Sequence, residues 1–328
     1  MYPSPTSRRG LLKLILSASM VGALFAYGPG AAAQTRITYK SAKTGSSYYQ
    51  MAVEIAQAMK AGSNGKIIVT VEESQGSVQN VMEAVNRPGN YVFTTPPSLV
   101  ALAQEGKAMF KDKQNPKFAE IRALFPIPSL TMHFVTRADA GIKSFADLAG
   151  KTMLIGKGSF GAKEAEKYFK LFGLEGKVKL ANVELNNAVP ALKNGQIDGF
   201  ATAGSYPAPN VIEAAAATSV HILSLSEDEI KQTKATRFVI PAGTYAGQKE
   251  DVVTTSLPVI AYTTTQMDDE TAYQLTRTFW TERAKMAATA PWWGGVNQKM
   301  LANIQGKIHP GALRYYKEVG YPVSDANR

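Results

Sequence analysis

The sequence alternates short extended segments with amphipathic helical segments, and this order constrains the fold more than any other feature. In the first third of the chain, extended segments at 36–40, 67–71 and 90–94 each precede a segment with helical periodicity. Such an order is typical of an α/β fold with a largely parallel sheet. The same alternation of extended and helical segments recurs between residues 152 and 225, which predicts a second α/β unit.

The last part of the chain predicts a return to the first unit. Residues 252–262 are β-rich, and helical patterns follow at 269–288 and 311–319. A chain that starts in one lobe, builds another and returns crosses between them twice, which permits hinge closure around a ligand. We therefore expect two lobes joined by a hinge. Lobe I comprises residues 34–134 plus 256–328, and lobe II comprises residues 138–252. The hinge segments lie near 134–138 and 252–256.

The first 33 residues have the pattern of a signal peptide. Arg8 and Arg9 belong to a basic start, residues 14–27 are apolar, and Ala31–Ala33 offers an A-x-A cleavage site. The arginine pair resembles a twin-arginine signal, and an ordinary Sec signal fits equally well. Either route predicts cleavage near Ala33 and a periplasmic mature protein.

Composition excludes several kinds of chemistry. The sequence has no cysteine, so thiolate metal sites and cysteine nucleophiles are impossible. The three histidines are far apart and show no metal-binding spacing: His133, His221 and His309. Three of the 36 basic residues and none of the 26 acidic ones lie before residue 34, which leaves a net charge of +7. Because these charges are spread singly, we expect no nucleic-acid partner.

Three turn-to-helix junctions indicate a binding cleft: residues 44–49, 75–80 and 158–161. Each follows a predicted strand, and ligands in open α/β sheets bind beyond the carboxyl ends of strands. The start of a helix offers free backbone N–H groups and partial positive charge, which suit an anion. Taken singly, each junction is explained by a helix cap; three of them from two lobes favour a cleft.

The candidate ligand-binding residues come from these junctions and from the ends of two further strands. They are Gly45, Ser46, Ser47, Tyr48, Tyr49, Gly76, Ser77, Asn80, Thr95, Ser159, Gly161, Gly204 and Tyr206. The two adjacent tyrosines point in different directions on a helix, so one packs inward and the other reaches the cleft, or both belong to an aromatic core. Tyr206 is the aromatic candidate of lobe II, with local packing in a turn as the alternative.

No catalytic or cofactor-binding motif accompanies these residues. The glycine-rich turn at 156–161 lacks the Lys-Ser/Thr end of a P-loop and the spacing of a dinucleotide fingerprint. Ser159 does not lie in a Gly-x-Ser-x-Gly elbow. We therefore expect no cofactor, no metal and no enzymatic activity. Trp292 and Trp293 are expected to pack on their lobe, with a partner surface as the alternative.

Several short motifs follow one another in a fixed order along the chain: Thr44–Tyr49, Gly76–Asn80, Asp147–Lys151, Gly156–Gly161, Ile197–Phe200, Ile240–Tyr245 and His309–Ala312. This ordered series resembles the TAXI family of TRAP-transporter solute receptors. They cover nearly the whole chain after the signal peptide. Ser46 stands where a glycine is common in the family, and Thr94–Pro97 lacks an acidic or glutamine residue often found there.

The resemblance implies a periplasmic-binding-protein type II fold with two α/β lobes joined by a two-segment hinge. It further implies delivery of a small organic acid, either a glutamate-like amino acid or a dicarboxylate, to the membrane subunits of a TRAP permease. We also expect the protein to be a monomer. Two alternatives use the same cleft: an exported enzyme and a ligand-sensing domain. The enzyme needs an acid or base near Ser77 or Ser159, for which Glu72, Glu73 and Glu184 are the candidates.

Overall fold

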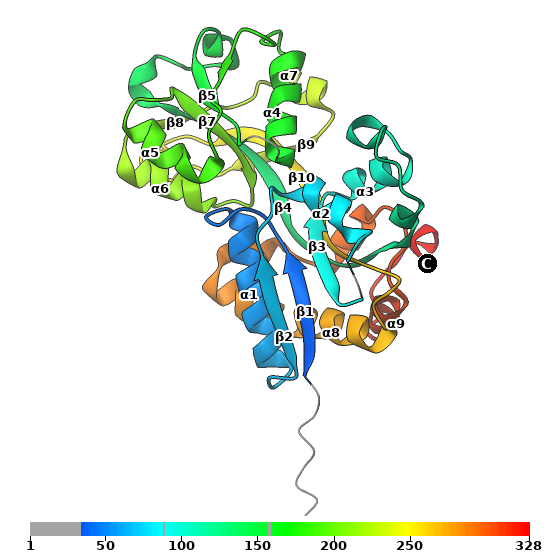
Figure 1. Ribbon diagram of the computed structural model, residues 1–328. Helices are drawn as coiled ribbons and strands as arrows, with labels where there is room; N and C mark the ends of the chain where they lie inside the picture. The colour runs from blue at the N-terminus through cyan, green and yellow to red at the C-terminus, as the bar shows by residue number, and fades with distance from the viewer. Residues whose placement is uncertain (1–33, 88, 157–158) are drawn as a thin grey trace, which may run out of the picture. The chain divides into compact units, whose positions relative to one another are not determined.

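The computed structural model describes residues 34–87, 89–156 and 159–328, and Figure 1 shows their arrangement. The expected signal peptide lies outside these residues, as do Lys157 and Gly158 of the glycine-rich turn. The strands are β1 Thr35–Lys40, β2 Ile67–Glu72, β3 Tyr91–Thr95, β4 Ile121–Arg137, β5 Thr152–Leu154, β6 Lys179–Leu180, β7 Gly199–Gly204, β8 Val220–Ile222, β9 Thr236–Ile240 and β10 Val252–Thr264.

Helices alternate with these strands through the first two thirds of the chain. The α-helices are α1 Ser47–Gly62, α2 Ser77–Ala84, α3 Pro97–Gln104, α4 Phe160–Leu171, α5 Ala188–Lys193, α6 Pro209–Ala217, α7 Glu227–Thr233, α8 Asp269–Thr289 and α9 Pro310–Glu318. Over the described ranges, no helix has both the length and the hydropathy needed to cross a membrane.

The sheet consists of two parallel groups joined by two long antiparallel strands. Its order is β2-β1-β3-β10-β4-β7-β5-β6, with β8 attached to β4 and β9 attached to β10. β1 runs parallel to β2 and β3, and β5 runs parallel to β6 and β7. β4 and β10 pair antiparallel with each other in the middle. The predicted α/β fold with a largely parallel sheet in each group is therefore present.

β4 and β10 are the strands that connect the two groups (Figure 1). β4 has 17 residues and β10 has 13. β4 pairs with β10 up to Thr131 and with β7 from Thr131 onward. β10 pairs with β9 up to Ser256 and with β3 from Ile260 onward. Both strands thus change partners near the position where Thr131 pairs with Ser256. The lobe and hinge boundaries drawn from the sequence stay a prediction.

The core contains two hydrophobic clusters. The larger one is continuous from α1 and β1 to α4 and contains Phe93, Phe134 and Tyr168. The smaller one lies under α5 and α6 and contains Phe200 and Val211. Because β4 contributes Phe134 to one cluster and its neighbour Val135 to the other, successive residues of this strand face opposite sides of the sheet.

Local signals explain why α1 begins and how it packs. Gly45 has a φ of +85°, which turns the chain into the helix at a position where a side chain would be strained. Ser46 caps the helix by accepting a hydrogen bond from the Tyr49 amide. Met51, Ile55 and Met59 then recur every four residues and are buried.

Several elements differ from the sequence prediction. β9 and α7 had no predicted counterpart, although Ser226 and Glu229 form a capping box at the start of α7. β4 begins at Ile121 and not near 133, because its first half is buried on both faces and shows no alternation. The strand expected at 178–183 is reduced to the two residues of β6.

Candidate functional site

The N-terminal ends of α1, α2 and α4 meet at one cavity, which we call the helix-tip cavity. It is lined by Ser46 at the start of α1, by Gly76 and Ser77 at the start of α2, and by Ser159 at the start of α4. The starts of α2 and α4 face each other closely, since a Cβ added to Gly76 would lie 4.0 Å from the Cβ of Ser159. The structure therefore brings together the three junctions that the sequence singled out.

The helix-tip cavity is suited to an anion. α1 and α4 are capped by the side chains of Ser46 and Ser159, whereas the N-cap residue of α2 is Gly76, and no side-chain cap is found there over the described residues. The first amides of α2 are therefore open to an acceptor from elsewhere, and each helix start adds partial positive charge. Lys43 also lines the cavity and contributes a full positive charge. Glu184 is the carboxylate among the lining residues that the structure describes.

Two other acids that the sequence placed near this site are engaged elsewhere. Glu72 pairs with Lys40 and Arg87 at 3.5 and 3.1 Å. Glu73 accepts hydrogen bonds from the amide and the hydroxyl of Thr44, and these bonds lower the pKa of the Glu73 carboxyl.

Asn80 supports the cavity from behind without lining it. Its Nδ2 donates to the carbonyl of Ser41 at 2.8 Å and to the carbonyl of Thr94 at 3.0 Å. Ser41 and Thr94 lie at the ends of β1 and β3 and both line the cavity. The side chain of Asn80 is fully buried. It therefore ties two strand ends together directly below the starts of α1 and α2.

Tyr48 forms part of the cavity wall. Its hydroxyl donates to the carbonyl of Pro128 in β4 at 3.3 Å, and Ser41 Oγ donates to the Tyr48 carbonyl at 2.7 Å. Burial and the neighbouring Tyr39 raise the pKa of the Tyr48 phenol, so it remains a neutral donor. Tyr49, the adjacent residue, is half-buried and does not line the helix-tip cavity.

The start of α1 also touches the end of β7. The Ser205 amide donates to Ser47 Oγ at 3.1 Å. A side chain on Gly204 would collide with the same Ser47 oxygen, and one on Gly161 would lie 2.8 Å from the Cβ of Ala203. Glycine at 161 and 204 thus allows α4 and α1 to approach β7 closely.

The volume of the helix-tip cavity is about 60 Å³. A water molecule occupies roughly 30 Å³, whereas pockets for small ligands measure about 300–1,000 Å³. The space between the three helix starts is therefore small. A solute the size of an organic acid requires them to move apart.

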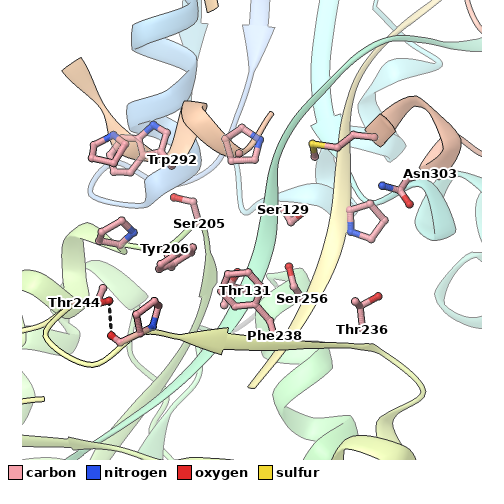
Figure 2. Close-up of a pocket in the computed structure, with 17 residues that line it drawn as sticks. Ser129, Thr131, Ser205, Tyr206, Thr236, Phe238, Thr244, Ser256, Trp292 and Asn303 are labelled. Carbon is pink, nitrogen blue, oxygen red and sulfur yellow. Dashed lines mark hydrogen bonds between the residues drawn. The ribbon is translucent and has the colours of Figure 1, made fainter. Parts of the chain in front are cut away.

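A second and larger cavity lies on the other side of β4 and β10. It has a volume of about 610 Å³ and is lined by Ser129, Thr131 and Pro258, among others. Their neighbours Leu130 and Val259 line the helix-tip cavity. Since successive residues of a strand point to opposite faces, the two cavities are separated by these strands. We call this one the Trp292 cavity, and Figure 2 shows its walls.

The predicted ligand-binding residues are distributed between these places. Six line the helix-tip cavity: Ser46, Tyr48, Gly76, Ser77, Ser159 and Gly161. Tyr206 lines the Trp292 cavity, and Gly45 lies in a small neighbouring hollow. The remaining five, which support or adjoin the sites, are Ser47, Tyr49, Asn80, Thr95 and Gly204. Their roles toward a ligand stay predictions.

Sequence reasoning missed several lining residues. Lys43 and Ser41 directly precede the Thr-Gly-Ser-Ser turn, so extending that junction by three residues would have found them. Thr94 and Thr202 lie near the ends of β3 and β7, in the same strand-end segments that the sequence indicated and from which Thr95 and Gly204 were chosen. Leu130 and Val259 had no signal, because only strand pairing brings them to the cavity.

Ser159 and two of the three histidines have structural hydrogen-bond partners. Ser159 Oγ accepts a hydrogen bond from the Ala162 amide at 2.9 Å and thereby serves as a helix cap. His133 is buried against Tyr245, and His309 is buried against the carbonyl of Met267. Among the described residues that line the helix-tip cavity, none is a histidine.

The sequence and the fold were compared with those of known proteins. The profile of one protein family, the NMT1-like family, matches residues 40–320. The structure of the periplasmic binding protein BugD superposes with a TM-score of 0.57 at 10% identity, over 89% of this chain and 99% of that one. MatC from Rhodopseudomonas palustris, solved with bound malate, gives 0.55 at 11% identity, over 88% and 97%.

A third structure, described as a periplasmic transporter, has a TM-score of 0.53 at 13% identity and covers 87% of this chain and 93% of its own. Identities this low establish the fold and nothing finer. The predicted fold, an α/β periplasmic-binding-protein architecture, is confirmed.

Proposed function

This chain belongs to the NMT1-like family, and we propose that it is a periplasmic solute receptor that holds a small organic acid in the helix-tip cavity. In this proposal the receptor is of the TAXI type and delivers its solute to a TRAP permease. The ordered sequence motifs support the TAXI assignment, and the periplasmic-binding-protein fold is compatible with it. The solute is a glutamate-like amino acid or a dicarboxylate.

One observation carries this proposal: three helix starts from distant parts of the sequence converge on one cavity that also contains Lys43. A carboxylate placed there would accept hydrogen bonds from the uncapped amides of α2. It would also gain from the partial positive charge of three helix starts and from one ammonium group. A neutral solute would gain much less from the same groups.

Glu184 favours the amino acid within this class. Glu184 lines the same cavity as the helix starts and offers an acceptor for an ammonium group. A dicarboxylate would instead place a second negative charge near it. We therefore propose that Lys43 and the amides of α2 bind the carboxylate and that Glu184 binds the ammonium group.

Calorimetric titration tests the proposal. L-glutamate, L-malate and succinate should be compared with L-glutamine and with the diamides of the two dicarboxylic acids, on protein whose fold is verified by circular dichroism. We expect binding of at least one acid and at least roughly 10-fold weaker binding after Lys43→Gln. A folded protein that binds none of the acids, with no acid found by mass spectrometry after purification, contradicts it.

One observation supports a second candidate function, an exported enzyme. Glu184 lines the same cavity as Ser77 and Ser159, so a carboxylate and two hydroxyls are present together. The capping bond of Ser159 with Ala162 argues against a nucleophile at that position. Product formation from a bound acid, abolished by Ser159→Ala and by Glu184→Gln, would favour the enzyme over the receptor.

Export is a separate part of the proposal. N-terminal sequencing of the protein recovered from the periplasm should give Gln34 as the first residue. Replacing Arg8 and Arg9 with lysine should block export if the twin-arginine route is used and should leave a Sec substrate exported.

A further inference from the structure

The Trp292 cavity has the size of a ligand site and lies apart from the helix starts. Its volume of about 610 Å³ falls within the roughly 300–1,000 Å³ usual for small-molecule pockets. Its walls come from β4, β10, β9, the end of β7 and the segment 291–303. Figure 2 shows Trp292 and Ser205 on one side of the cavity and Asn303 and Thr236 on the other.

Aromatic and other apolar side chains form much of these walls. The rings of Tyr206 and Phe238 pack edge to face with their centroids 4.9 Å apart. Trp292 and Met300 add a further ring and a thioether. Such surfaces bind ring-shaped ligands by apolar contact and by ring packing.

The polar groups in the cavity are uncharged. Hydroxyls come from Ser129, Thr131 and Ser256, and an amide comes from Asn303. No residue that lines it within the described ranges is Asp, Glu, Lys, Arg or His. An ion bound against these walls would give up part of its hydration and meet no opposite charge among the lining residues, which is unfavourable.

Ser205 provides an independent indication of a ligand. Its side chain is 1% exposed and lines the cavity, and its Oγ has no hydrogen-bond partner in the part of the chain that the structure describes. Buried hydroxyl groups are normally paired. The Oγ lies below the cavity surface, so rotation of the Ser205 side chain about χ1 would bring it to a ligand hydroxyl or carbonyl group that supplies the missing partner.

Buried hydrogen bonds hold the aromatic walls in place. The Ala208 amide donates to the Tyr245 hydroxyl at 2.9 Å, and that hydroxyl lies 2.7 Å from His133 Nε2. This network anchors the segment that carries Tyr206. Trp292 is held as well, because its Nε1 donates to the Glu54 carboxylate at 2.9 Å. Walls that are fixed before binding reduce the entropy lost when a ligand binds.

We propose that the Trp292 cavity is a second binding site, which takes an uncharged small molecule with a ring-shaped apolar body and one hydroxyl or carbonyl group. This ligand class differs from the organic acid proposed for the helix-tip cavity. The two sites are therefore independent in chemistry as well as in position.

Three probes of the same shape and different charge test the proposal: benzyl alcohol, benzoate and benzylamine. Binding would be followed at pH 7 by tryptophan fluorescence and by saturation-transfer NMR. We expect saturable binding of benzyl alcohol and at least about 10-fold weaker binding of both ions. Ser205→Ala should weaken benzyl alcohol roughly 3- to 10-fold, and Phe238→Ala should weaken it at least about 5-fold.

Ser77→Ala serves as the matched control, because it removes a hydroxyl from the helix-tip cavity and should leave the affinity for benzyl alcohol unchanged. Urea unfolding verifies that each variant is folded before titration. The proposal is overturned if folded wild-type protein does not bind benzyl alcohol saturably. It is also overturned if the three probes bind equally, or if Ser77→Ala abolishes binding while Phe238→Ala does not. None of these results bears on acid binding at the helix starts.

Discussion

The Ser205 amide donates a hydrogen bond of 3.1 Å to Ser47 Oγ, and the two residues are 158 positions apart in the sequence. The bond joins the first residue of α1 to the residue that follows β7. Both ends are buried. On one side of this contact lies the helix-tip cavity, and Ser205 itself lines the Trp292 cavity on the other. The contact therefore controls how closely α1 and β7 approach.

We expect Gly204→Ala to disturb this contact. The new methyl group would collide with Ser47 Oγ, and overpacking of this kind costs about 1–3 kcal/mol. Urea unfolding should show a free energy of unfolding that is lower by this amount. Solution scattering should show an increased radius of gyration. Ser47→Ala should restore much of the stability in the double variant, because the Ser47 Cβ would lie at 3.4 Å.

Gly294→Ala is the matched control for that experiment. A Cβ at Gly294 would meet no atom within 4 Å, so its free energy of unfolding and radius of gyration should remain those of the wild type. Equal effects of the two alanine substitutions would show that the contact between Ser47 and β7 is unimportant.

Asn80→Asp should be more destabilising than Asn80→Ala. The aspartate would place carboxylate oxygens where Nδ2 now donates to the carbonyls of Ser41 and Thr94. Removing the two bonds costs about 1–3 kcal/mol, and a buried charge beside two carbonyl oxygens costs about 3 kcal/mol or more. Urea unfolding at pH 7 should therefore give a lower free energy of unfolding for Asn80→Asp than for Asn80→Ala. The exposed Asn182→Asp is the control, and an equal loss there would contradict the assignment.

Stability should fall with decreasing pH because His133 is buried as a neutral group. Burial lowers its pKa to about 4, whereas an unfolded histidine titrates near 6.5. Between these values the unfolded chain binds more protons, so His133 stabilises the fold fully above pH 6.5. This contribution, about 3 kcal/mol, is lost as the pH falls from 6.5 to 4.

The variant His133→Gln separates this effect from the titration of other groups. Burial also lowers the pKa of His309, so part of the pH dependence will remain. Chemical denaturation at several pH values should show wild-type stability falling more steeply than that of the variant below pH 6.5. Parallel curves for the two proteins over this range would refute the role of His133.

Glu54→Ala should loosen the segment that carries Trp292 and Trp293. One oxygen of Glu54 accepts both indole N–H groups, at 2.9 and 2.5 Å. Removing the carboxylate leaves two indole N–H groups without this acceptor. We therefore expect the free energy of unfolding to fall by about 1–3 kcal/mol and the tryptophan emission to shift. Glu175→Ala removes an exposed ion pair with Lys170 and should change neither quantity. If Glu54→Ala changes neither the free energy of unfolding nor the tryptophan emission, this account is contradicted.

Local sequence patterns predicted much of the fold and part of the site. The starts of α1, α2 and α4 were predicted within about two residues, because serine caps and turn glycines act on the residues next to them. The same patterns selected six residues that line the helix-tip cavity. Local patterns could not show that Tyr206 lines a different cavity. The walls of the Trp292 cavity come from strands whose positions depend on pairing between distant segments.

By itself, the sequence determined most of the order of strands and helices, α7 and β9 excepted, and the residues at which α1, α2 and α4 begin. Hydrogen bonds and side-chain periodicity within a few residues decide both. The tertiary structure alone decided that β4 and β10 run together through the middle of the sheet. Their pairing places Leu130 and Val259 on one face and Ser129, Thr131 and Pro258 on the other, and so separates two cavities. Strand register is a contact between distant segments, and a local pattern carries no information about it.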